Sequence, residues 1–191
     1  MNIGIYIYDQ AEVLDFSGPF EVFSTAKRLG ALDWQVSLIA EQPGVVKARG
    51  HYLIEPHYHI DNHPPLDLLI VVGGDHSQEM HKTAVLEWLA RIAPDTPQVA
   101  SVCTGAFLLA NAGLLDGLTV TTHWEDIDAL KAFSALNVVD DKRFVEQGKW
   151  TTSAGISAGI DMSLHLVAKL VSQELAEKTA RQMDYRWIQT P

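Results

Sequence analysis

The residues whose types could best support a chemical reaction surround Cys103, the single cysteine of this 191-residue chain. It stands in the stretch ASVCTGAFLLANAG, between an apolar run at residues 99–102 and a helical pattern at residues 105–111. A strand, a turn at Thr104 and Gly105 and a helix form a nucleophile elbow, which presents one side chain at the carboxyl end of a sheet. The partial positive charge of a helix N-terminus favours a thiolate. We therefore expect Cys103 to be a nucleophile; the alternative is a small buried hydrophobe.

A thiol nucleophile needs an acid or base within hydrogen-bonding reach. The loop after the first predicted strand reads DQAEVLDFSGPFEVF and offers four carboxylates, Asp9, Glu12, Asp15 and Glu21. Asp15 is the preferred candidate, because Leu14 and Phe16 give it an apolar setting that desolvates the carboxyl group and raises its pKa. The alternative is that Asp15 caps the following helix, with Ser17 and Pro19 marking the start of that helix.

Two further segments end at the same predicted sheet edge. LLIVVGGD places Gly73 and Gly74 just after a strand. Their backbone can approach a ligand and point N–H groups at developing negative charge, although turns also use paired glycines. His123, in TTHW, ends a weak strand and can reach the site, or it can be a hydrogen-bonded structural residue. We keep these three residues as substrate-binding candidates, and whether Glu21 contributes stays open.

A histidine-rich segment raises the question of a metal site. HYLIEPHYHIDNH gathers four histidines within residues 51–63. Their spacing is irregular, and Pro56 and Pro64 break any helix that would align them, so we predict a polar surface hairpin and no metal site. Walker A and G-x-G-x-x-G phosphate loops are absent from the sequence, and we expect no cofactor.

Strands and helices alternate along the chain. Strands are predicted at residues 3–8, 35–40, 68–72 and 99–102, with a weaker one at 119–122. Helices are predicted at residues 19–29, 83–92, 105–111 and 124–133. Continuous apolar strands such as LLIVV indicate burial on both faces, which is typical of a parallel sheet covered by helices. The alternation predicts an α/β fold with a doubly wound, mostly parallel sheet sandwiched by helices.

Two segments depart from this alternation. Residues 137–152 read as two short strands around Glu146-Gln147-Gly148, a small β-hairpin added to the sheet or near its edge. Residues 156–185 carry apolar side chains three or four apart, which predicts one amphipathic helix or two in succession. With 47% hydrophobic residues, the chain is predicted to form a single domain over residues 1–191.

The charge and the N-terminus limit the partners. A net charge of −10 repels phosphate backbones and anionic membrane surfaces, so we expect no nucleic acid and no membrane partner. The start MNIGIYIYDQ lacks the features of a secretion signal, and no apolar run approaches the roughly 18 residues that span a bilayer. A lone cysteine also fits a reducing compartment, so we expect a cytoplasmic protein. The partner that we expect is a small-molecule substrate.

The motifs around these residues resemble the ThiJ/PfpI superfamily, relatives of class I glutamine amidotransferases. The resemblance runs over nearly the whole chain, through VLDFSGPFEVF, VVGG, SVCTGAFLLANAGLLDG, TTHW and SAGISAGIDMSLHLV. It implies a flavodoxin-like or glutamine amidotransferase-like fold and a homodimer. Within the superfamily, the sequence looks most like isocyanide hydratases and the ligand-sensing domain of AraC-type regulators. Thr104 stands where PfpI-type proteases carry histidine, which argues against protease chemistry.

The resemblance to isocyanide hydratases rests on Cys103, Thr104 and Asp15. It implies hydration of an isocyanide to an N-substituted formamide through a thioimidate, with Cys103 attacking, Asp15 moving protons and Thr104 helping to orient the thiol and substrate. Two other functions stay open: a non-catalytic ligand-sensing domain, and a stress-response protein whose thiol reacts with aldehydes or oxidants. No basic helix-turn-helix follows the sensor-like region in this sequence, so we expect no direct DNA binding.

Overall fold

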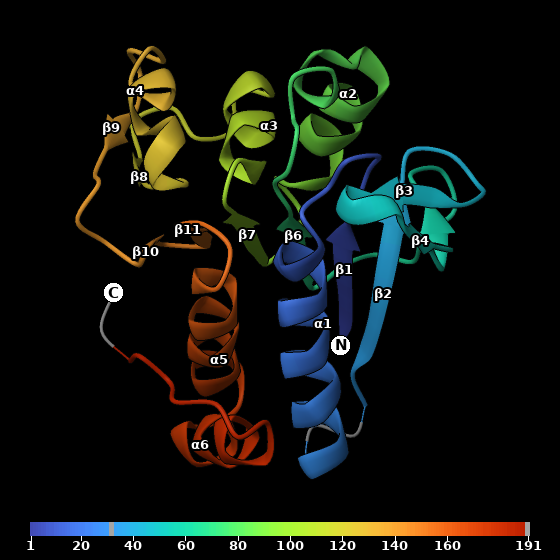
Figure 1. The fold of residues 1–191 in the computed structure, drawn as a ribbon, viewed down its shortest axis with the longest axis vertical. Helices are drawn as coiled ribbons and strands as arrows, with labels where there is room; N and C mark the ends of the chain where they lie inside the picture. The colour runs from blue at the N-terminus through green and yellow to red at the C-terminus, as the bar shows by residue number, and fades with distance from the viewer. Residues whose placement is uncertain (31–32, 190–191) are drawn as a thin grey trace.

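The computed structural model describes residues 1–30 and 33–189 and confirms the predicted, mostly parallel α/β sandwich (Figure 1). Its main sheet has the strand order β10-β11-β7-β6-β1-β2-β5. These strands are β1 (Asn2–Tyr6), β2 (Gln35–Ala40), β5 (Tyr58–His59), β6 (Leu68–Val71), β7 (Gln98–Val102), β10 (Phe144–Gln147) and β11 (Trp150–Ser153). Neighbouring strands are parallel except for the antiparallel pair β10 and β11. The four strongest strand predictions therefore fall on the strands β1, β2, β6 and β7.

Helices cover the sheet and bury its apolar strands. They are α1 (Val13–Leu29), α2 (Thr83–Ile92), α3 (Gly105–Asn111), α4 (Ile127–Leu130), α5 (Ala158–Leu170) and α6 (Gln173–Gln182). Helices α1, α5 and α6 pack against one another, and α2 packs against α3 (Figure 1). All four residues of β6 are fully buried, as its continuous apolar sequence predicts. No helix in the described ranges is long and apolar enough to cross a bilayer.

The topology creates a crevice where β1 and β6 lie side by side. The chain leaves β1 toward β2 and leaves β6 toward β7, so the two crossovers run in opposite directions along the sheet. Right-handed crossovers place the intervening helices on opposite faces, and the loops beyond the carboxyl ends of β1 and β6 separate. The residues after β1, β6 and β7 therefore meet at one edge.

Helix α1 begins earlier than predicted. It starts at Val13, with Glu12 as a N-cap residue that makes no side-chain capping bond, and Pro19 lies inside the helix. Proline inside a helix removes one hydrogen bond, but burial of an apolar face of this helix, including Phe16 and Phe23, outweighs that local signal. The alternative that Asp15 caps a helix starting near Pro19 is wrong, because Asp15 lies in the first turn of α1.

The weak strand predicted at residues 119–122 does not join the main sheet. Only β8 (Thr119–Val120) forms, and it pairs with β9 (Asn137–Val138) in a separate two-stranded parallel sheet. The place beside β7 is taken by β11, which pairs with β7 over four residues. The helix predicted at 124–133 is reduced to a 3-10 turn, η3 (Trp124–Asp126), and the short α4.

The hairpin predicted within residues 137–152 forms as β10 and β11 at the edge of the sheet, but its turn is Gly148-Lys149, because Glu146 and Gln147 belong to β10. Residues 137–138 lie in β9 of the smaller sheet. Gly148, between these strands, has a φ of 66°, which a turn residue without a side chain adopts at low cost. Residues 156–185 form two helices, α5 and α6, rather than one.

The histidine-rich segment is only partly the predicted surface hairpin. Strand β4 (Tyr52–Ile54) pairs with β3 (Val46–Ala48) across the 3-10 turn η1 (Arg49–His51), whereas β5 joins the main sheet. His57 Nδ1 accepts a hydrogen bond from the Leu38 N–H, and His63 Nε2 accepts one from the Trp88 indole. Among the described residues, no group of three or more His, Cys, Asp or Glu side chains is placed to hold a metal ion.

Candidate active site at the Cys103 elbow

Cys103 occupies a strained turn between β7 and α3. Its φ is 54°, in the left-handed region that costs energy for a residue with a side chain. The Cys103 N–H donates to the Ser153 carbonyl at 3.2 Å, and the Thr122 hydroxyl donates to the Cys103 carbonyl at 2.8 Å. A Cβ on Gly105 would lie 2.1 Å from the Val71 carbonyl oxygen, so only glycine fits there. The surrounding structure thus holds the strand-turn-helix bend of a nucleophile elbow.

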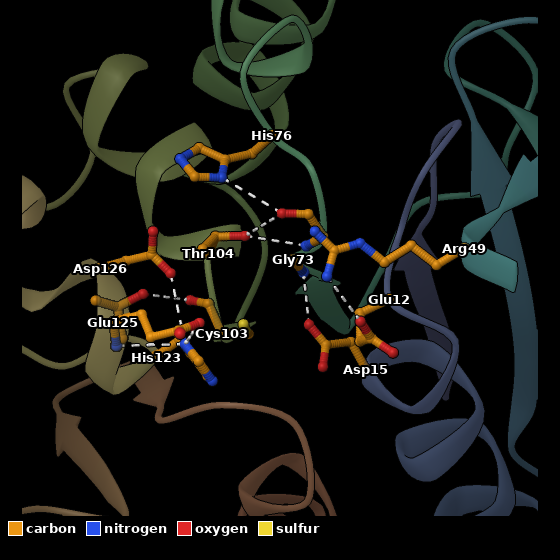
Figure 2. Close-up of polar contacts among 12 residues, drawn as sticks. Glu12, Asp15, Arg49, Gly73, His76, Cys103, Thr104, His123, Glu125 and Asp126 are labelled. Atoms are coloured by element: carbon orange, nitrogen blue, oxygen red, sulfur yellow. Dashed lines mark hydrogen bonds and ion pairs between the residues drawn. The ribbon is translucent and has the colours of Figure 1, made fainter.

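A polar cavity of about 350 Å³ opens beside Cys103, a residue that is 6% exposed (Figure 2). Loops after β1, β3, β6, β7, β8 and β11 contribute to its wall. Thr104, Gly74 and His123, predicted from the sequence, are among the lining residues. A cavity with a thiol in its wall at the carboxyl edge of an α/β sheet has the placement of a small-molecule site.

Asp15 is fully buried at this edge. Its Oδ2 accepts a hydrogen bond from the Gly73 N–H at 3.0 Å, whereas its Oδ1 lies in the interior without a hydrogen-bond partner. Burial raises the pKa of Asp15 from 3.8 to about 7; the Gly73 hydrogen bond acts in the opposite direction, Glu12 adds to the rise, and the Cys103 thiol lowers the pKa. The sequence prediction of a raised pKa for this carboxyl group agrees with the structure.

The prediction of a resting thiolate at Cys103 is wrong. Burial, followed by the negative charge of Asp15, raises the pKa of the Cys103 thiol to about 12. The backbone N–H groups of Thr104 and Ile156 act in the opposite direction but are outweighed. The dipole of α3, a helix of seven residues, cannot overcome the loss of water around sulfur. The resting pair is therefore a neutral thiol beside a carboxyl group that titrates near neutrality.

The two glycines after β6 do not offer their N–H groups to a substrate. Gly73 donates to Asp15, and Gly74 donates to the Thr104 hydroxyl at 3.0 Å. That hydroxyl in turn donates to the Gly74 carbonyl at 3.0 Å, so Thr104 fixes the loop through its side chain. A Cβ on Gly73 would lie 2.5 Å from Thr104 N and 2.9 Å from Asp15 Oδ2. Both glycines therefore let the backbone come close to Asp15 and Thr104 and hold them in place. The expectation was different, namely that their N–H groups would bind developing negative charge on a substrate.

His123 and Glu21 have different surroundings. His123 lines the cavity, and its Nδ1 accepts a hydrogen bond from the Glu125 N–H at 3.4 Å. The sequence left open whether His123 reaches the site or is a hydrogen-bonded structural residue. In the structure it lines the cavity and also makes a hydrogen bond. Glu21 accepts a hydrogen bond from Thr25 on α1 and borders a different cavity, beside Tyr52. The structure does not bring Glu21 to the Cys103 cavity.

Several lining residues had no clear signal in the sequence. They are Arg49, Asp75, His76, Glu125, Asp126 and Ile156. Arg49 comes from the turn between β3 and β4, and its Nη1 lies 3.1 Å from Glu12 Oε2. Asp75 is the last residue of the GGD motif and His76 follows it, and Glu125 and Asp126 directly follow TTHW, so extending the search along those two motifs would have found them.

Comparison with known proteins shows the family of the chain. Residues 1–169 match the DJ-1/PfpI family. The chain is 33% identical over 186 residues to isonitrile hydratase of Pseudomonas putida, covering 97% of this chain and 78% of that protein. It is 30% identical over 170 residues to the HTH-type transcriptional regulator CdhR of Pseudomonas aeruginosa, covering 89% of this chain but only 51% of the regulator. A solved ThiJ/PfpI family protein from Pseudomonas syringae superimposes with a TM-score of 0.88 at 28% identity, over 96% of this chain and 74% of that one. The chain belongs to the DJ-1/PfpI family.

Proposed function

We propose that this protein hydrates small isocyanides to N-substituted formamides, with Cys103 as the nucleophile and Asp15 as the group that moves protons. The observation that carries the proposal is the buried pair itself, a neutral thiol next to a carboxyl group whose pKa is raised to about 7. A group that titrates near the working pH can both accept and deliver a proton. The similarity to isonitrile hydratase over 97% of the chain supports the same reaction.

In the first half-reaction, the Asp15 carboxylate takes the thiol proton while the Cys103 sulfur bonds to the terminal carbon of R–N≡C. The resulting carboxylic acid delivers that proton to the same carbon, which gives the thioimidate R–N=CH–S. The N–H groups of Thr104 and Ile156, which stabilise negative charge on the sulfur, favour the attacking form of the thiol.

In the second half-reaction, a water oxygen bonds to the thioimidate carbon while Asp15 accepts a proton from that water. Asp15 passes the proton to the substrate nitrogen. The carbon–sulfur bond then breaks as the new hydroxyl becomes the carbonyl, the hydroxyl proton returns to sulfur, and R–NH–CHO leaves. One water is consumed for each isocyanide, and the thiol and the carboxylate are regenerated.

Incubation of the purified protein with an alkyl isocyanide, with the formamide followed by NMR, tests this proposal. Cys103→Ala and Asp15→Asn are expected to lose formamide production, while the matched change Asp128→Asn keeps it. The Asp128 side chain is 98% exposed and pairs with Lys131, and it does not line the cavity. Formamide production that survives Cys103→Ala would refute the role of the thiol.

The second candidate is a ligand-sensing domain that does not turn its ligand over. The 30% identity to the CdhR regulator, close to the value for the hydratase, favours it. A ligand that raises the melting temperature without being consumed would support this function. The stress-response alternative has less support, because sulfur reacts with peroxide as the thiolate and the pKa of Cys103 is raised. Ready formation of sulfinic acid at Cys103, detected by mass spectrometry, would reverse that order.

The homodimer implied by the family resemblance is also a proposal. Tyr52 and Leu53 on β4 are 52% and 64% exposed, and the Tyr52 ring lies 6.3 Å from that of Phe16 on α1. Apolar exposure of this kind supports pairing through α1 and the β3–β4 hairpin. Sedimentation equilibrium tests it, with Leu53→Glu expected to give monomers. The proposed reaction needs a reduced thiol, which fits the cytoplasmic location that we propose.

A further inference from the structure

The cavity beside Cys103 carries an excess of negative charge. Four carboxylates line it, from Glu12, Asp75, Glu125 and Asp126. Among the described lining residues, Arg49 is the only lysine or arginine, and its guanidinium is paired with Glu12 at 3.1 Å. The remaining three carboxylates share the described wall with the imidazoles of His76 and His123 and with no second lysine or arginine.

His123 lies beside two of these carboxylates, those of Glu125 and Asp126. Its Nδ1 lies 3.7 Å from Glu125 Oε2 and 3.6 Å from Asp126 Oδ2. The same nitrogen also accepts a hydrogen bond from the Glu125 N–H at 3.4 Å. Figure 2 shows His123, Glu125 and Asp126 gathered on one side of Cys103, with Arg49 and Glu12 on the other. The acidic pair is thus separated from the one guanidinium.

This negative charge acts on the reacting atom. The Asp126 carboxylate is among the groups that raise the pKa of the Cys103 thiol. Asp75 stays ionised, because hydrogen bonds from the Ser77 hydroxyl, at 2.7 Å, and backbone N–H lower its pKa. A cation bound beside these carboxylates would offset their effect at sulfur and make the thiol easier to deprotonate.

We propose that the substrate is a cationic alkyl isocyanide, with a protonated amine at the end opposite the isocyano group. Glu125 and Asp126 hold the ammonium group while the isocyano carbon reaches Cys103. This specificity rests on the proposed hydratase function. A carboxylate-bearing isocyanide would meet the same acidic wall, and the guanidinium of Arg49 that could receive it is already paired.

A matched set of three isocyanides tests this charge preference. 3-(Dimethylamino)propyl isocyanide, 4-methylpentyl isocyanide and 4-isocyanobutanoate have the same three-carbon chain and the same branching, and they are cationic, neutral and anionic at neutral pH. We expect kcat/KM to fall by about tenfold from the cation to the neutral compound and by about tenfold again to the anion at low salt. Added salt is expected to shrink both ratios.

Variants show which carboxylates are responsible. Asp126→Asn and Glu125→Gln are expected to reduce the ratio of cationic to neutral kcat/KM several-fold, and the double variant more. The ratio is the informative quantity, because Asp126 also affects the thiol and the common rate will change. Asp128→Asn is the matched control, since that exposed carboxylate lies two residues beyond Asp126 but does not line the cavity.

Binding of the same three compounds to Cys103→Ala, measured by calorimetry, separates this inference from the hydratase function. The order cation, neutral, anion in binding, with no turnover by the wild type, would keep the charge preference and remove the function. Turnover and binding that do not distinguish the three compounds, or that favour the anion, would overturn the charge preference and leave the function standing. A ratio that is the same in Asp126→Asn, Glu125→Gln and the wild type would overturn the assignment of the acidic pair.

Discussion

Replacement of Asp15 by asparagine is expected to stabilise the protein at alkaline pH and to do so progressively less as the pH falls. The carboxyl group is fully buried, and burial is the main cause of its raised pKa. Asparagine has nearly the same shape, its side-chain oxygen can accept the Gly73 hydrogen bond, and it cannot ionise. The variant therefore removes the cost of a buried charge without removing the packing.

The magnitude follows from the pKa of the carboxyl group in the folded and unfolded chains. A pKa raised from 3.8 to about 7 means that the folded protein holds this proton more tightly than the unfolded chain. The contribution to stability is therefore largest below the unfolded pKa and is lost as the pH rises through the folded pKa. The rise of about three pKa units corresponds to about 4 kcal/mol, of which about 3 kcal/mol is lost between pH 5 and pH 8.

Urea unfolding of the wild type and Asp15→Asn at pH 5 and pH 8 measures this effect. Taking the difference between the two proteins at each pH cancels the titration of all other groups. We expect this difference to move in favour of the variant by about 3 kcal/mol between pH 5 and pH 8. Asp128→Asn, which changes an exposed carboxylate, should show a change near zero over the same range.

A difference between the two proteins that does not change with pH would refute the reasoning, even if the variant were more or less stable overall. The reasoning would also be refuted if the variant became less stable relative to the wild type as the pH rises. Either result would mean that the Asp15 carboxylate keeps its hydration or a cationic partner in the folded protein, and the acid and base roles proposed for it would lose their physical basis.

Three more predictions concern the same site and its support. The rate of Cys103 alkylation by iodoacetamide is expected to keep rising at pH values above the pKa of an ordinary cysteine. Asp15→Asn is expected to shift this pH profile to lower pH, because the carboxylate raises the thiol pKa. An unshifted profile would contradict the coupling between the two groups. Gly73→Ala is expected to lower the free energy of unfolding by about 1–3 kcal/mol in urea, because its Cβ would lie 2.5 Å from Thr104 N; a neutral effect would mean that the loop is not tightly held. Asp161→Asn is expected to lower the free energy of unfolding by about 2 kcal/mol and to speed amide hydrogen exchange at residues 185–189. The reason is that this buried carboxylate accepts hydrogen bonds from a tyrosine hydroxyl and a backbone N–H of that segment. Unchanged exchange would contradict that anchoring.

The central sheet could be predicted from the sequence because its strands carry their signal locally. Apolar runs such as residues 68–72 fit only a strand that is covered on both faces, and β6 is that strand. The elbow is equally local, since residues 102–105, from the end of the strand to the start of the helix, are consecutive in the chain. The raised pKa of Asp15 was also predicted in the right direction, but only one of its two apolar neighbours, Phe16, is buried; Leu14 is 38% exposed, so the burial of Asp15 comes from the folded chain.

Other features depend on distant contacts and left no local pattern. The weak strand at 119–122 lost its place beside β7 to β11, which competes from 30 residues further along and pairs over four residues. Pro19 predicted a helix start, but α1 begins six residues earlier, at Val13, because its apolar face is buried against the rest of the chain. The thiol pKa was predicted in the wrong direction, because the helix N-terminus is visible in the sequence while the burial of sulfur and the charge of Asp15 depend on the folded chain.

The pKa values of the Cys103–Asp15 pair give a physical reason for burying the nucleophile of the proposed reaction. A sulfur that is neutral at rest reacts slowly with oxidants and alkylating agents, because those reactions need the thiolate. Asp15, with a pKa near 7, is the group poised to remove the proton once an electrophilic carbon is in place. A cationic substrate held by Glu125 and Asp126 would supply the missing positive charge at that moment. Reactivity would then depend on the substrate, which protects the single cysteine between turnovers.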